Sequence, residues 1–219
     1  MDKQAFYNTL NSIPQFNNYG EKVTVVGATK TVNVETINYA AELGLLHVGE
    51  NKVQELLEKY DNYPPCTLHF IGHLQTNKVK QVVGKVELIQ SVDSKKLATE
   101  INKQAQKLGI VQQILIQVNI SKEPQKHGFL PEEGLSSYQF IKELKHVKVR
   151  GFMAMLAKSE NENKISALCL QMREIYDIIA KDDKYFNILS MGMSADFKIA
   201  VKNGSNMVRL GSYLFGKRN

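Results

Sequence analysis

Eight short apolar segments, separated by stretches with helical spacing, constrain the fold of this chain more than any other feature. Between the segments apolar residues recur every three or four positions, as at Leu97, Ile101 and Ala105, which is typical of an amphipathic helix. Strict alternation of strands and helices favours a parallel sheet. The eight expected strands lie at 23–29, 46–49, 68–71, 86–90, 113–118, 147–155, 186–190 and 207–210.

The length of the chain decides how this sheet is closed. Eight units in 219 residues are near the lower size limit of a (β/α)₈ barrel. An open doubly wound sheet is the alternative, but it rarely needs eight similar units without a glycine-rich first turn, and residues 27–30 (GATK) are not one. Since no proline- or glycine-rich linker interrupts the pattern, we predict a single-domain α/β fold, a (β/α)₈ TIM barrel over 1–219, with an N-terminal helix at roughly 1–12.

Composition excludes several classes of function. No apolar run approaches the roughly 20 residues of a membrane span, and the polar start has no signal-peptide core. The two cysteines, Cys66 and Cys169, are expected to be free thiols, as in a cytoplasmic protein. The net charge of +6 comes from scattered lysines on helix faces, so we expect no nucleic-acid partner. No histidines and carboxylates show metal-ligand spacing, and we expect no metal site.

The ends of the first, seventh and eighth strands carry the candidate site. In such barrels the chemistry lies at the C-terminal ends of the strands, often with a phosphate site after strands 7 and 8. Small residues and hydroxyls follow those two strands, at 190–194 and 211–212, and Gly192 and Gly211 permit close approach of the backbone to an anion. Lys30 ends the first strand, which neighbours the eighth once the barrel closes. A lysine beside a phosphate site suggests a phosphorylated aldehyde held as a Schiff base, and hence pyridoxal 5′-phosphate (PLP).

Each of these residues also has an ordinary structural interpretation. Lys30 alone would be read as a rim lysine whose stem lies on apolar surface; burial of its amine would instead favour the neutral, nucleophilic form. Ser194 fits the N-cap of a helix at 195–203, which is compatible with phosphate binding. Arg209 lies within an apolar strand, so it either points inward to an acceptor such as a ring nitrogen or pairs outside with a carboxylate. A lone buried His69 is by default a core residue.

Seven runs of the sequence resemble the YggS/PROSC family, the pyridoxal phosphate homeostasis proteins. The resemblance covers essentially the whole chain in order, and it implies a barrel similar to the N-terminal domain of bacterial alanine racemase with PLP in its mouth. His73 stands where many relatives have proline, and Ser212 where many have threonine. The runs are GATK (27–30), VGENKVQE (48–55), HFIGHLQTNK (69–78), KHGF (126–129), RGFMAM (150–155), LSMGMSADF (189–197) and MVRLGSYLFG (207–216).

The resemblance implies roles for ten residues. Lys30 corresponds to the lysine that forms the covalent aldimine with PLP, and Arg209 to the arginine that faces the pyridine nitrogen. The phosphate-binding positions are Ser194 with the backbone of Met193, and Gly211 with Ser212. Asn51, His69, Met153 and Ser190 match positions that line the cofactor pocket.

The family resemblance implies PLP binding for intracellular vitamin B6 homeostasis, as a store or a donor to PLP-dependent apo-enzymes, with no established catalytic turnover. A positive charge at the ring nitrogen makes PLP a poorer electron sink. Alanine racemase uses a second base that a further domain supplies. We expect this chain, which runs to Asn219, to have no room for such a domain. A weak racemase is the alternative, with Tyr213 or His69 as the second base, and a Schiff-base aldolase using Lys30 is more distant. We expect a monomer, because no exposed apolar helix stands out.

Overall fold

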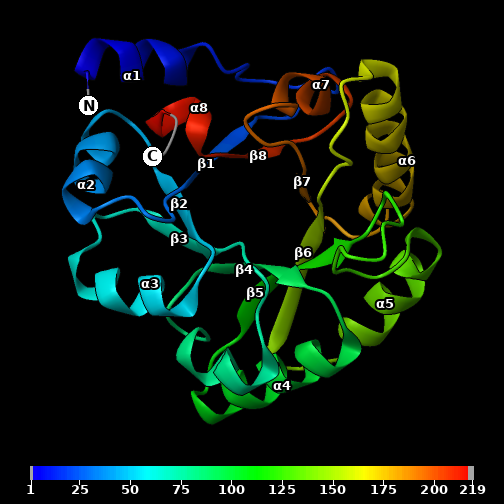
Figure 1. Cartoon of the computed structure of the whole chain (residues 1–219). Helices are drawn as coiled ribbons and strands as arrows, with labels where there is room; N and C mark the ends of the chain where they lie inside the picture. Colours follow the sequence, from blue (N-terminus) through cyan, green and yellow to red (C-terminus); the bar gives the residue numbers. More distant parts are fainter. Residues whose placement is uncertain (1, 217–219) are drawn as a thin grey trace.

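A computed structural model describes residues 2–216 of the chain, so Met1 and residues 217–219 of the expected domain lie outside the described part. Eight parallel strands form a closed barrel in the order β1 to β8, as the alternation predicts, and helices surround it (Figure 1). The strands are β1 (Thr24–Ala28), β2 (His47–Glu50), β3 (Thr67–Phe70), β4 (Leu88–Val92), β5 (Gln112–Val118), β6 (Val147–Ala154), β7 (Ile188–Ser190) and β8 (Met207–Leu210).

The helices follow the expected alternation with two departures. The segment after β3 is the 3₁₀ helix η2 rather than an α-helix, and the chain after β8 forms a helix of four residues. The α-helices are α1 (Lys3–Asn11), α2 (Val34–Glu42), α3 (Val53–Lys59), α4 (Lys95–Lys107), α5 (Gly134–Ile141), α6 (Glu162–Ala180), α7 (Phe197–Lys202) and α8 (Ser212–Phe215), and the 3₁₀ helices are η1 (Tyr60–Asn62), η2 (Thr76–Gln81) and η3 (Pro131–Glu133).

The helices cover the barrel because each presents an apolar face to it. Ser94 caps α4 by accepting from the Leu97 N–H, and the buried residues of that helix include Leu97, Ile101 and Ala105, spaced as expected. The expected N-terminal helix is α1, which lies beside α8 (Figure 1), where the rings of Phe6 and Phe215 are 6.0 Å apart. No described helix has the length and apolar character required to cross a membrane.

The pairing of β1 with β8 closes the barrel and sets the position of the candidate site. Val26 pairs with Arg209 and Gly27 with Leu210. This register places the end of β1, and therefore Lys30, next to the turn that begins at Gly211. Residues separated by about 180 positions in the chain thus meet at one edge of the barrel.

The barrel interior is mixed rather than uniformly apolar. A small apolar cluster of Val26, Leu88, Leu115, Met153 and Met207 fills part of it, while the main core lies between the strands and the helices. Polar side chains complete the interior, and their hydrogen bonds are described with the site below.

Candidate functional site

A cavity of about 540 Å³ opens at the C-terminal ends of the strands, within the roughly 300–1,000 Å³ range of small-molecule sites. It collects residues from the ends of β1, β2, β3, β6, β7 and β8. Eight of the ten predicted site residues line it: Lys30, Asn51, Met153, Met193, Ser194, Arg209, Gly211 and Ser212. The sequence therefore placed most of the candidate residues at one site, although they come from distant parts of the chain.

Lys30 lies two residues beyond the end of β1, at the edge of this cavity. Its side chain is exposed, so the expectation of a desolvated amine is wrong for this structure. The reason is that β1 ends at Ala28 and the chain turns outward, with Thr31 in a left-handed conformation at φ 61°. The amine is within reach of a ligand and also open to solvent.

A buried carboxylate holds the segment before Lys30 in place. Glu50 has no exposed surface, and its Oε1 accepts from Thr29 Oγ1 at 2.7 Å, from Lys59 Nζ at 2.8 Å and from Tyr63 OH at 2.8 Å. Burial and the neighbouring Glu50 charge raise the pKa of Tyr63, which keeps its hydroxyl a donor. Lys59 also donates to the Thr29 carbonyl at 2.9 Å. The sequence analysis missed this network, because its members lie in β2, α3 and the loop beyond, without a recognisable spacing.

Ser194 does not cap the helix that follows it, contrary to the expected N-cap role. Its Oγ accepts from the Gly211 N–H at 3.2 Å and the Tyr213 N–H at 3.1 Å. The following helix begins at Phe197, so Ser194 lies too early to cap it. The hydroxyl instead joins the turn after β7 to the turn after β8, which places the Ser194 oxygen at the backbone donors expected for phosphate.

Two details of this turn differ from the phosphate-site expectation. The Met193 N–H donates to Asp196 Oδ1 at 2.6 Å and is therefore occupied in this structure. Gly192 has φ 96°, and a Cβ there would lie 2.8 Å from the Cβ of Ala200 and 2.9 Å from the Cα of Phe197. This glycine is thus required by the packing of α7 against the turn, rather than by the approach of an anion.

Arg209 points inward, so the outward, ion-paired interpretation is wrong. It is 5% exposed, and its guanidinium donates to the Ser190 carbonyl at 3.0 Å, to Ser190 Oγ at 2.6 Å and to the Ala154 carbonyl at 2.9 Å. Burial lowers the pKa of Arg209 to about 10, against the opposing effect of Asp196. Arg209 therefore remains a fixed positive charge at neutral pH, on the wall of the cavity.

Asn51 lines the same cavity and has one unpaired polar atom. Its Oδ1 is buried and has no hydrogen-bond partner among residues 2–216. A buried polar group of this kind is costly unless a ligand or water satisfies it. A ligand or water that reached this oxygen would satisfy it.

His69 and Ser190 lie outside the lining of this cavity. His69 lines a second cavity, at the opposite mouth of the barrel, together with His47. Hydrogen bonds nonetheless connect it to Arg209: Ser190 Oγ donates to Gln90 Oε1 at 2.7 Å, and Gln90 Nε2 lies 3.0 Å from His69 Nδ1. His69 Nε2 lies 3.1 Å from His47 Nδ1. A continuous polar chain thus crosses the barrel interior.

Neither suggested second base reaches the cavity. His69 is at the other mouth, as above, and Tyr213 directs its hydroxyl to Ser12 Oγ, 3.1 Å away, while its ring packs against Phe197. Among the described residues that line the cavity, the titratable side chains are those of Lys30 and Arg209.

The buried histidine makes stability depend on pH. Burial, with a smaller effect of His47, lowers the pKa of His69 from 6.5 to about 3. Below pH 6.5 the unfolded chain binds a proton that the folded chain does not, so the free energy of unfolding falls as the pH drops towards 3. We expect His69 to account for a loss of about 2 kcal/mol between pH 6.5 and 5. Urea unfolding of wild type and of His69→Gln at both pH values measures this loss of free energy. An equal pH dependence in the two proteins would show that His69 is not its cause.

Comparison with known proteins identifies the family to which the chain belongs. Residues 2–219 match the family model "Alanine racemase, N-terminal domain". The pyridoxal phosphate homeostasis protein of Aquifex aeolicus is 44% identical over 200 residues, which cover 89% of this chain and 86% of the relative. The chain belongs to the YggS/PROSC family of pyridoxal phosphate homeostasis proteins. A further homeostasis protein, from Pasteurella multocida, is 35% identical over 222 residues, covering 99% of this chain and 95% of that relative.

Solved structures agree with membership of the homeostasis family. PipY of Synechococcus elongatus without PLP is 28% identical, with a TM-score of 0.88 over 99% of this chain and 100% of that chain. The same protein with PLP bound has a TM-score of 0.82 at 29% identity, over 96% of this chain and 100% of that one. An alanine racemase of Clostridium difficile, 16% identical, shares the fold with a TM-score of 0.80 over 99% of this chain and 56% of its own.

Proposed function

We propose that this member of the homeostasis family binds PLP in the cavity described above, as a Schiff base with Lys30. The observation that carries the proposal is that one cavity contains the Lys30 amine, the hydroxyls of Ser194 and Ser212 and the buried charge of Arg209. A PLP-bound structure of a protein 29% identical to this chain supports the same ligand.

The residues present fit the three parts of the cofactor. The hydroxyls of Ser194 and Ser212 provide donors for a phosphate, which would compete with Ser194 Oγ for the Gly211 and Tyr213 N–H groups. Arg209 provides a fixed cation for the pyridine nitrogen, where it disfavours ring protonation. The Lys30 amine condenses with the aldehyde, forming a C=N bond and releasing the aldehyde oxygen as water. Asn51 lines the same cavity.

We further propose storage and delivery of PLP rather than catalytic turnover. Racemisation needs a base on each face of the cofactor, and neither Tyr213 nor His69 reaches the cavity. The exposure of Lys30 supports release, because an incoming amine can reach the Schiff base without opening a lid. The cited relatives are likewise named for homeostasis and not for a reaction.

The Schiff base is tested by absorption spectroscopy and borohydride reduction. Wild type mixed with PLP is expected to show an aldimine absorption band, and reduction should fix one pyridoxyl group that peptide mapping places on Lys30. Lys30→Ala should lose the band completely, because no other residue of the described part that lines the cavity carries an amine. Lys52→Ala is the matched control, since Lys52 is a neighbouring lysine whose side chain is 68% exposed; it should keep the band. An adduct that persists in Lys30→Ala would refute the assignment.

Delivery and turnover are separated by two assays on the loaded protein. Transfer of PLP to an excess of a PLP-dependent apo-enzyme should restore that enzyme's activity faster than hydrolytic release into buffer allows. Incubation with L-alanine in D₂O should leave the α-proton unexchanged. Exchange at the α-carbon that depends on Lys30 would instead support the racemase alternative.

A further inference from the structure

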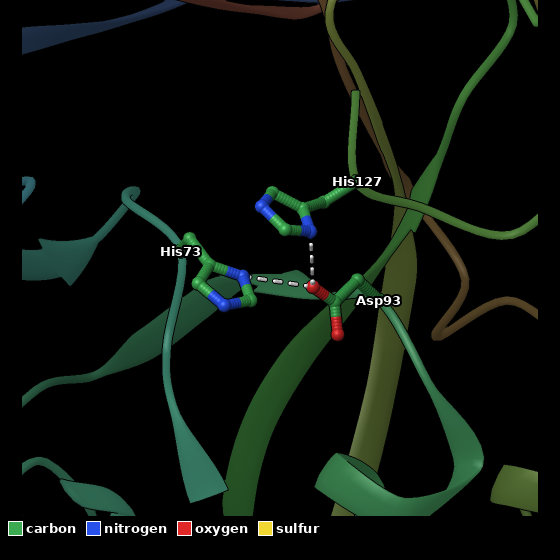
Figure 2. Close-up of side chains that lie close together, drawn as sticks. All are labelled: His73, Asp93 and His127. Atoms are coloured by element: carbon green, nitrogen blue, oxygen red, sulfur yellow. Dashed lines mark hydrogen bonds and ion pairs between the residues drawn. The ribbon is translucent and has the colours of Figure 1, made fainter. Parts of the chain in front are cut away.

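Two histidines and an aspartate meet at the barrel rim, outside the cavity described above (Figure 2). His73 follows β3, Asp93 follows β4, and His127 lies in the loop after β5. Each comes from a different βα loop, at the end of the barrel where the C-terminal ends of the strands lie. The sequence spacing gave no sign of this cluster, because the barrel topology brings the three loops together.

The donor atoms are spaced for one ion. Asp93 Oδ2 lies 3.0 Å from His73 Nδ1 and 3.8 Å from His127 Nδ1, and one ligand atom from each residue lies within 4.8 Å of the others. Ligand atoms in a tetrahedral zinc site are about 3.4 Å apart when the bonds are about 2.1 Å long. The two separations given above lie on either side of that value.

The Asp93 carboxylate has no cationic side chain to neutralise it. Its side chain is 11% exposed, and within residues 2–216 its ion-pair contacts are the two imidazoles alone. A half-buried carboxylate that faces two imidazoles without a lysine or arginine is stabilised by a cation between them. The geometry thus brings a carboxylate oxygen and two imidazole nitrogens to one place, which are ligand types that a divalent ion of the zinc type takes.

The two rings can adjust to an ion. They are stacked, with centroids 3.8 Å apart and planes inclined by 11°. Coordination of one ion requires the rings to turn apart about their terminal torsions, which have broad minima. The side chains are 42% and 58% exposed, so solvent leaves room for that rotation.

We propose that His73, Asp93 and His127 form a binding site for a divalent transition-metal ion of the zinc type. Imidazole donors favour zinc, copper, nickel and cobalt, whereas magnesium and calcium take oxygen ligands. Three protein ligands leave at least one coordination position open to water or another ligand. The bound ion fastens together the loops that follow β3, β4 and β5. The loop that follows β3 also carries Ile71, which lines the candidate PLP cavity.

The site is tested with Zn²⁺ alone on the purified full-length chain, freed of metal by a chelating resin. Calorimetry should show one equivalent bound by wild type, and at least about a tenfold loss of affinity in each of His73→Ala, Asp93→Asn and His127→Ala. Zn²⁺ should also raise the melting temperature of wild type but not of these variants. His146→Gln is the control, because His146 is a half-buried histidine that bonds the Ile110 carbonyl instead; it should bind as wild type does.

Co²⁺ provides a second, spectroscopic readout that folding defects do not imitate. The Co²⁺ protein should show visible d–d bands without a thiolate charge-transfer band, because neither cysteine belongs to the site. The bands should disappear in the three ligand variants while their circular dichroism remains that of wild type. No Zn²⁺ binding by wild type, or binding of equal strength in the ligand variants, would overturn the proposal.

Discussion

Replacing Lys59 by methionine is expected to lower the free energy of unfolding by about 3–5 kcal/mol, because it leaves the buried charge of Glu50 without its cation. Glu50 is fully buried and Lys59 Nζ lies 2.8 Å from its Oε1, while Glu50 Oε2 already has no hydrogen-bond partner within the described chain. The two remaining donors, Thr29 and Tyr63, are neutral hydroxyls. Urea denaturation followed by circular dichroism measures the loss.

Two further variants separate charge from packing in this network. Glu50→Gln combined with Lys59→Met removes both charges and should recover a large part of the stability lost in the single variant. Lys52→Met breaks an exposed pair with Glu55 at 3.5 Å and should change stability by less than about 1 kcal/mol. A double variant as unstable as Lys59→Met would show that packing, and not the uncompensated charge, causes the loss.

Gly151→Ala is expected to cost more than about 4 kcal/mol, at the severe end of the range for single substitutions. Gly151 lies in β6 with φ 151°, and a Cβ there would lie 1.7 Å from the carbonyl oxygen of Ile188 in β7. The conflict is with the backbone of a neighbouring strand, so no side chain can move aside to relieve it. The expected measurement is a large fall in the denaturation midpoint or failure to obtain folded protein.

Gly20→Ala is the matched control for this effect. Gly20 also has a positive φ, 75°, but nothing lies within 4 Å of a Cβ placed there. It should show only the cost of the left-handed conformation, about 1–2 kcal/mol. Equal losses in the two variants would mean that backbone conformation, rather than contact with β7, explains the requirement for glycine at 151.

The fold was predictable because its signal is repeated along the chain. Eight apolar segments with helical spacing between them correspond to β1–β8, and the barrel that they predict is confirmed. Position at a strand end then predicted most of the cavity lining, since the C-terminal ends of parallel strands share one mouth. The helix expected after the last strand is α8, only four residues long, whereas the 3₁₀ helix η2 was not predicted, because a tight helix has no clear periodicity.

What the sequence could not predict depends on contacts between segments that are distant in the chain. The hydroxyl of Ser194 would be an ordinary N-cap by local rules, but the turn after β8 supplies its partners. The exposure of Lys30 follows from where β1 ends. His69 is buried, as its default reading as a core residue predicts, but it lines the opposite mouth of the barrel rather than the cavity that the resemblance implies.

The seam between β1 and β8 has a consequence for folding. Lys30 belongs to the first strand, whereas Ser194, Arg209 and Ser212 follow or form the last two, and pairing of Val26 with Arg209 is what joins them. In a partly folded chain in which β8 is not paired with β1, the Lys30 amine and the anion site lie on segments that are not in contact. A ligand that bridges the two therefore selects the closed barrel, and its occupancy reports that the last strand has docked against the first.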